Sequence, residues 1–243
     1  MKIIEFESLP STSQYIKENI KDIEEYVYII AKEQTNGRGR TGNSWVSSSD
    51  NLMFSFKINP NKISVDDYPL ITLLTGLAVR NTLSHISNCD EILIKWPNDI
   101  ICNNKKICGI IAEGIFKDNN SIIIGIGINV NQDIFCEELK NKATSLKIAF
   151  KKSFDKNDIL EKFDEEFRLL YKSFENHDKS FIETINDYNY LKEKEVLINN
   201  EEYENKTFVC MHINSNGNLA LRDENNNLVE INSNEVTLKN IYN

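Results

Sequence analysis

The chain has 243 residues and a mass of 28.1 kDa, a length that fits one large domain or one large and one small domain. Its hydrophobic content of 40% against 27% charged residues excludes wholesale disorder. A net charge of -9 does not favour a nucleic-acid-binding face, and we expect no nucleic-acid partner. Five cysteines without C-x-x-C spacing indicate neither a disulfide framework nor a zinc site.

The first residues of the chain lack the charged and then apolar layout of a signal peptide. No apolar run approaches the roughly 20 residues that span a bilayer. We therefore expect a cytoplasmic protein that does not associate with a membrane.

The N-terminal part of the sequence predicts two strands, at 2–7 and 25–32, with a short helix between them. The helix begins at the S-T-S-Q segment of residues 11–14, which has the form of a capping box. The stretch 34–50 has neither a helical nor a strand period, so it predicts a long loop. Such loops are uncommon in compact domains unless they have a function.

The central part predicts a strand, a helix and three more strands. Residues 51–59 alternate with one apolar face, and 66–86 carry a single apolar stripe at helical spacing. Segments 91–96, 106–116 and 121–130 read as strands separated by turn signals at 97–99, 103–104 and 118–120. Short turns between consecutive strands predict antiparallel pairing rather than a βαβ arrangement.

The C-terminal part changes character near residue 192. An amphipathic helix from 158 and a short helix at 180–188 precede it. Short strands at 195–199, 206–213, 218–223, 228–231 and 235–241 follow, with hairpin turns at 216–217 and 225–227. We therefore predict two domains, 1–192 and a small β-barrel at 193–243.

The scarce residues of the chain are concentrated in the long loop. There are 9 Gly, 5 Arg and 2 Trp, and six of these sixteen fall between Gly37 and Trp45. The run G-R-G-R-T-G matches a dinucleotide fingerprint, but no helix-forming sequence follows, and Asn43 stands where a phosphate loop needs lysine. The two arginines and the glycines predict an anion-binding lid, and the alternative is a solvated turn.

Two further segments are candidates for chemistry. Lys95 is predicted at a strand end, where it could neutralise a phosphate or remain a surface charge. Asn98 and Asp99 behind it could hold a metal or form a turn. Gly125 and Gly127 leave one strand face without side chains, which suits either a flat ligand or a closely packed helix.

Together, four motifs resemble those of the bacterial biotin protein ligases, in the same order and spacing. They are the G-R-G-R-x-G-x-x-W loop, K-W-P-N-D, K-x-x-G-I at 106–110 and G-I-G-I-N-V at 125–130. The S-T-S-Q segment resembles the family's S-T-N-Q, and the resemblance runs from Ile4 to about Leu238. The catalytic motif begins at residue 11, which leaves no room for the N-terminal DNA-binding domain of many relatives, so the resemblance implies a monofunctional ligase without repressor activity.

The resemblance implies a fold and an activity. The fold is α/β (α+β), a mixed and largely antiparallel sheet flanked by helices and related to class II aminoacyl-tRNA synthetases and lipoate ligases, followed by a small β-barrel. The activity is ATP-dependent formation of biotinyl-5′-AMP and transfer of biotin to a lysine of the biotin carboxyl carrier protein of acetyl-CoA carboxylase. The substrates are biotin and ATP, Mg²⁺ is expected with ATP, and the protein is a monomer or a homodimer.

The resemblance also implies site residues, carried over by position. Lys95 and Arg40 are the catalytic residues, with Lys95 on the reacting carboxylate and α-phosphate, and Arg40 retaining the intermediate. Trp45, Lys106, Gly109 and Asn129 are expected on the nucleotide side, and the metal ligands are not identified. The residues expected to contact biotin or its adenylate are Ser11, Thr12, Ser13, Gln34, Gly37, Arg38, Gly39, Arg40 and Lys95.

The sequence departs from the family pattern at three positions. Ser13 replaces the family asparagine, and Thr41 and Asn43 replace residues that are often basic, which predicts looser phosphate retention. Two alternatives stay open: a lipoate or octanoate ligase of the same fold, and a non-catalytic biotin-sensing module.

Overall fold

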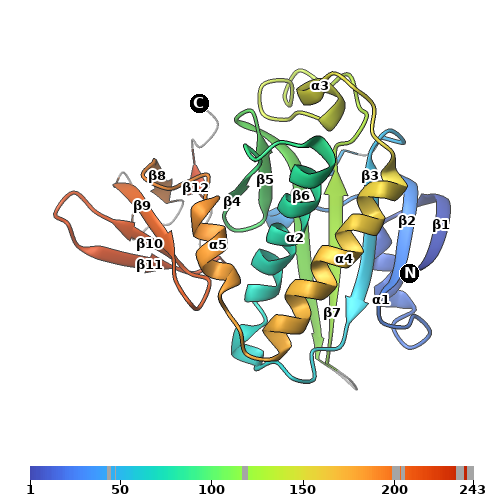
Figure 1. Ribbon diagram of the computed structural model, residues 1–243, viewed down its shortest axis with the longest axis horizontal. Helices are drawn as coiled ribbons and strands as arrows, with labels where there is room; N and C mark the ends of the chain where they lie inside the picture. Colours follow the sequence, from blue (N-terminus) through green and yellow to red (C-terminus); the bar gives the residue numbers. More distant parts are fainter. Residues whose placement is uncertain are drawn as a thin grey trace.

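A computed structural model describes residues 1–42, 45–46, 48–116, 120–198, 203, 206–233 and 238–239. It contains a seven-stranded sheet in the order β1-β2-β3-β7-β6-β5-β4 and a five-stranded sheet in the order β11-β10-β9-β8-β12. The two sheets lie at opposite sides of the molecule (Figure 1). The strands of the large sheet are β1 (Lys2–Leu9), β2 (Val27–Gln34), β3 (Leu52–Ile58), β4 (Leu93–Lys95), β5 (Asp99–Cys102), β6 (Lys105–Phe116) and β7 (Asn120–Ile128).

Helices cover both faces of the large sheet. On one face lie α2 (Leu70–Ser87) and α4 (Lys156–Glu175), side by side (Figure 1). On the other face lies α1 (Thr12–Glu18), which contacts β2, β3 and β7. The remaining helical segments are η1 (Arg40–Gly42), η2 (Val65–Asp67), α3 (Leu146–Phe150) and α5 (Phe181–Asp187).

The sheet is mixed and mostly antiparallel, as predicted. Strands β3 to β7 pair antiparallel with their neighbours, because short turns join β4, β5, β6 and β7. Strands β1 and β2 are parallel, and this pair makes the sheet mixed. Helix α1 lies between them in the chain and returns it to the same end of the sheet, which parallel pairing requires.

The strand β3 and the helix α2 are more buried than their sequence patterns predicted. All seven residues of β3 are buried. Its Phe54 and Phe56 pack edge-on against Phe163 of α4, while the Lys57 ammonium on the opposite face donates to the Ile20 carbonyl at 2.6 Å. Helix α2 is buried on most of its surface rather than along one stripe, because it lies between the sheet, α4 and α5.

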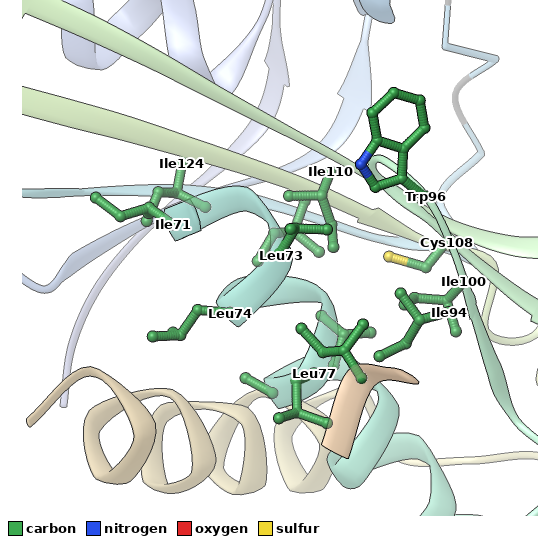
Figure 2. Close-up of a cluster of buried hydrophobic side chains, with 14 of the residues drawn as sticks. Ile71, Leu73, Leu74, Leu77, Ile94, Trp96, Ile100, Cys108, Ile110 and Ile124 are labelled. Atoms are coloured by element: carbon green, nitrogen blue, oxygen red, sulfur yellow. The ribbon is translucent and has the colours of Figure 1, made fainter. Parts of the chain in front are cut away.

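Strand β5 and helix α3 are absent from the sequence prediction. The four residues of β5 lie between two turn signals at 97–99 and 103–104, and such a short segment gives no measurable period. Its Ile100, together with Ile94 and Cys108 of the flanking strands, faces Leu73 and Leu77 of α2 in the buried core (Figure 2). This core fixes the edge of the sheet that carries Lys95.

The small antiparallel sheet comprises β8 (Glu195–Ile198), β9 (Thr207–Ile213), β10 (Leu219–Arg222), β11 (Leu228–Ile231) and β12 (Leu238–Lys239). The predicted second β unit is therefore confirmed, although part of its last predicted strand lies outside the described residues. The predicted boundary at 192/193 falls between α5 and β8. One hydrophobic cluster continues from the core of the large sheet into this unit. Among the described helices, none has the length and apolar character to cross a bilayer.

Candidate active site

Most of the predicted site residues gather around one cavity. It lies where the N-terminus of α1, the end of β2, the loop after Gly37 and the glycine face of β6 and β7 meet. Its volume of about 70 Å³ is smaller than common ligand sites of roughly 300 Å³ or more, and Arg40, Ile110 and Ile111 also line a neighbouring hollow of about 760 Å³. The lining residues that the sequence predicted are Ser11, Thr12, Ser13, Gln34, Arg38, Gly39, Arg40, Trp45, Lys106 and Gly109.

A chain of hydroxyl groups forms the floor of the cavity. Gln34 Oε1 accepts from the backbone N–H of Thr12 at 2.8 Å and from its hydroxyl at 3.2 Å. Thr12 Oγ1 lies 2.7 Å from Ser55 Oγ, and Ser55 Oγ lies 2.8 Å from Ser13 Oγ. Ser11 positions this segment, because its side chain accepts from the Gln14 N–H and caps α1.

The direction of these hydrogen bonds follows from counting protons. Each hydroxyl has a single proton, and Thr12 gives its proton to Gln34 Oε1. Of the two arrangements that these contacts permit, the one compatible with this bond has Ser55 donating to Thr12 and Ser13 donating to Ser55. The Ser13 oxygen is left with acceptor lone pairs, so this part of the floor suits a ligand with N–H donors.

The glycine face of the sheet lies beneath Ser13 and the Trp45 indole. A Cβ on Gly125 would lie 2.5 Å from Ser13 Oγ, and a Cβ on Gly127 would lie 2.5 Å from Trp45 Cε2. Gly109, the register partner of Gly127, contacts the same indole. The face therefore accommodates both a tryptophan from the loop and the start of a helix. Trp45 Nε1 is buried without a hydrogen-bond partner in the described part of the chain, so a ligand acceptor would satisfy it.

The arginine loop folds back over the cavity. Gly37 is buried below Trp45, and its carbonyl accepts from the Trp45 N–H at 3.0 Å. Arg38 is exposed and Arg40 is half-buried. Arg40 Nη1 donates to Asn98 Oδ1 at 3.3 Å, and its Nη2 donates to the Ser233 carbonyl beyond β11. Arg40 thus joins the loop, the K-W-P-N-D segment and the small β unit.

Lys95 lies behind the cavity rather than in its lining. It ends β4, is 8% exposed, and is paired in register with Asp99. Asp99 Oδ1 lies 2.6 Å from Lys106 Nζ, which does line the cavity. Burial lowers the pKa of Lys95 to about 8, whereas the Asp99 charge opposes this shift. Lys95 is therefore connected to the cavity indirectly, through Asp99 and then Lys106.

Asn129, like Lys95 and Gly37, lies outside the lining. It is 5% exposed and ties three segments together. Its Nδ2 donates to the Thr144 carbonyl at 3.0 Å, and its Oδ1 accepts from Asn51 Nδ2 at 3.3 Å. These contacts are typical of a residue that shapes a loop. Asn43 and its effect on phosphate binding lie outside the described residues.

Sequence reasoning missed Ser55 as a site residue. Ser55 is a polar residue in an otherwise apolar strand, at 0% exposure. A serine between Phe54 and Phe56 was the available signal, because a buried hydroxyl needs a hydrogen-bond partner.

No metal site is evident in the described ranges. They contain no group of three or more His, Cys, Asp or Glu side chains that could hold an ion. Asp99, the acid considered for this role, faces two lysines. The described residues therefore identify no ligand set for Mg²⁺, and no step below passes through the ion.

Comparison with known proteins places the chain in a family. Residues 5–131 match the Biotin/lipoate A/B protein ligase family. The chain is 37% identical over 153 residues to the Bifunctional ligase/repressor BirA of Bacillus spizizenii, covering 61% of this chain and 47% of that protein. It is 32% identical over 123 residues to the Biotin--[acetyl-CoA-carboxylase] ligase of Mycobacterium tuberculosis, covering 49% and 44%.

Solved structures agree over a longer range. The Biotin protein ligase from Aquifex aeolicus, in complex with biotin and ATP, superposes with a TM-score of 0.88 at 30% identity, covering 98% of each chain. The chain spans about half the length of the first curated relatives it matches. This chain belongs to the biotin/lipoate protein ligase family.

Proposed function

We propose that this protein activates biotin with ATP and transfers it to a lysine of a biotin carboxyl carrier protein. The observation that carries the proposal is the cavity itself: a hydroxyl floor at Ser13 and Ser55 lies beside the paired arginines of the loop. The resemblance to the Aquifex aeolicus ligase, which binds biotin and ATP, supports the same substrates here.

The first step joins two anions. The biotin carboxylate attacks the α-phosphate of ATP, the bond to the β-phosphate oxygen breaks, and pyrophosphate leaves, giving biotinyl-5′-AMP. Because like charges approach each other, positioned cations lower the barrier. Arg38 and Arg40 of the loop and Lys106 in the cavity lining are the cations in position, with Lys95 behind them.

The second step uses the acceptor as nucleophile. The amine of the acceptor lysine attacks the acyl carbon, AMP leaves, and an amide forms with release of a proton. The enzyme needs no nucleophile of its own in either step. It must instead retain the mixed anhydride until the acceptor arrives, and Arg40, held by Asn98 and Ser233, is placed to close the cavity.

The floor of the cavity favours biotin over lipoate. A ureido ring carries two N–H donors, and the Ser13 oxygen with its proton committed to Ser55 offers an acceptor. The dithiolane ring of lipoate has no N–H donor and would leave this half-buried acceptor without a ligand partner. This difference applies although the family includes both kinds of ligase.

Pyrophosphate release and acyl-adenylate formation test the proposal. The purified chain is incubated with ATP and Mg²⁺ and with biotin, lipoate or octanoate. We expect acyl-adenylate and pyrophosphate in the incubation with biotin, and neither product with lipoate or octanoate. Turnover with lipoate or octanoate alone would indicate the lipoate or octanoate branch, and biotin binding without adenylate would indicate a sensing module.

A further inference from the structure

Asp99 lies at the start of β5, with lysines on the strands at both sides. The register pairs Asp99 with Lys95 of β4, and directly opposed residues have Cβ atoms about 4.5–5.5 Å apart. On the other side, Asp99 Oδ1 lies 2.6 Å from Lys106 Nζ of β6. One carboxylate therefore faces two ammonium groups, and the second of these groups lines the cavity.

The cluster is largely shielded from water. The Asp99 side chain is 15% exposed and the Lys106 side chain 29%, and Lys95 is 8% exposed. Charges interact more strongly where solvent screening is weak. The strands that hold these residues are fixed by the core in Figure 2, where Ile94, Ile100 and Cys108 face α2.

Positive charge dominates around Lys95. The charged groups that act on it are Asp99 of β5, Lys106 of β6 and Lys194, just before β8. Asp99 also attracts the Arg40 guanidinium. Asp99 is thus the acid that offsets these cations, in the region where the proposed reaction places the biotin carboxylate and the ATP phosphates.

We propose that Asp99 is a positioning residue for adenylate formation: it holds Lys106 by an ion pair and keeps Lys95 in the ammonium form. The proposal rests on the proposed function, because the carboxylate and phosphates of that reaction are what a protonated Lys95 would neutralise. The sequence had suggested a turn or a metal ligand at this position.

The proposal predicts a direction for the pH dependence. Burial lowers the pKa of Lys95 to about 8, Asp99 raises it, and Lys106 and Lys194 lower it. Lys95 is charged below its pKa, so kcat/KM, which reports the ligand-free enzyme, falls as the pH rises through about 8. Removing the Asp99 charge moves this fall to lower pH, and removing the Lys194 charge moves it to higher pH.

The test is the rate of pyrophosphate release with biotin and ATP as a function of pH. Asp99→Asn keeps the shape of the side chain and removes its charge. For this variant we expect the alkaline limb of the pH–rate profile to move to lower pH by about one unit. For Lys194→Gln, we expect the limb to move up with the plateau rate unchanged. Asp164→Asn is the matched control: it breaks a 2.8 Å pair with Arg168 on α4 at a similar exposure of 16%, neither residue lines the cavity, and it should leave the limb in place.

A second measurement separates this proposal from the proposed function. The pKa of Lys95 is measured in the ligand-free protein by NMR of ¹³C-labelled lysine, with the resonance assigned by its loss in Lys95→Gln.

Absence of adenylate from the wild-type chain would contradict the proposed function and, with it, the role of Asp99. Adenylate formation with an unmoved limb and an unmoved Lys95 pKa in Asp99→Asn would overturn the Asp99 proposal alone. If Asp99→Asn does not fold, an unmoved limb in Lys194→Gln overturns it.

Discussion

At the scale of single residues, Ser55 links two predicted site residues that the sequence alone does not connect. Its hydroxyl is hydrogen-bonded to those of Thr12 and Ser13. The Ser55→Ala variant breaks this chain and leaves the Thr12 hydroxyl without its donor. We expect the KM for biotin to rise about tenfold, which corresponds to roughly 1.4 kcal/mol of lost binding, with little change in kcat.

Steady-state kinetics of pyrophosphate release measures this effect, and Ser121→Ala is its matched control. Ser121 is also buried in the large sheet, and its hydroxyl donates to Asn59 Oδ1 at 2.7 Å, at the other end of β7. Both variants should lose stability, and only Ser55→Ala should change KM. Equal KM values in the two variants would remove Ser55 from the site.

Arg40 is the residue that we propose closes the cavity. Its guanidinium reaches Asn98 and the Ser233 carbonyl, so the loop is held across the site. For Arg40→Gly, we expect adenylate formation to continue while the intermediate escapes and labels unrelated lysines. Adenylate in the filtrate and biotin on added serum albumin are the measurements, with Arg38→Gly for comparison. An unchanged lifetime of bound adenylate would contradict the lid.

At the scale of elements, the glycine face of β7 leaves room for the Trp45 indole to pack against the sheet. A Cβ on Gly127 would meet the Trp45 indole at 2.5 Å, so Gly127→Ala must displace the indole. We expect a shift of tryptophan emission and a large loss of adenylate formation. Gly76→Ala in α2 is the control: its added Cβ has no neighbour nearer than 3.8 Å, and alanine stabilises a helix interior by about 0.5–1 kcal/mol. Unchanged emission and activity in Gly127→Ala would contradict the close packing.

The sequence predicted most helices and strands, because their apolar periods are long enough to measure. It missed β5, whose four residues give no period between two turns. That omission concealed the Asp99 pairing, since residues 97–99 read as a turn. Only the family resemblance placed the loop at 37–45, the start of the helix at residue 11 and the lysines Lys95 and Lys106 in one site. The hydroxyl chain through Ser55 depends on a contact between α1 and β3 that no local pattern encodes.

At the scale of the whole molecule, the two sheets are joined by specific contacts. Asn186 of α5 donates to the Ile213 carbonyl at 2.8 Å and accepts from its N–H at 2.7 Å. Trp96 Nε1 donates to the Gly217 carbonyl at 2.9 Å, and Arg40 reaches Ser233. The small β unit therefore touches the K-W-P-N-D segment and the lid. We propose that the small β unit stabilises the K-W-P-N-D segment and the arginine loop in the positions described above.

Removing the Asn186 clamp tests this coupling. Asn186→Ala leaves both backbone groups of Ile213 without partners, so we expect a loss of about 2 kcal/mol in the free energy of unfolding and faster proteolysis within 193–233. Urea unfolding and timed digestion are the measurements. Asn225→Ala, in an exposed turn, should change neither. Equal stability in the two variants would show that the clamp contributes nothing.

The most direct test of the central claim is the mass of a purified carrier protein after incubation with this chain, ATP, Mg²⁺ and biotin. We predict that the carrier gains one biotin, that the gain requires ATP, and that it is lost when the acceptor lysine is replaced by arginine. An unchanged mass with active carrier, or a gain with lipoate in place of biotin, would contradict the assignment.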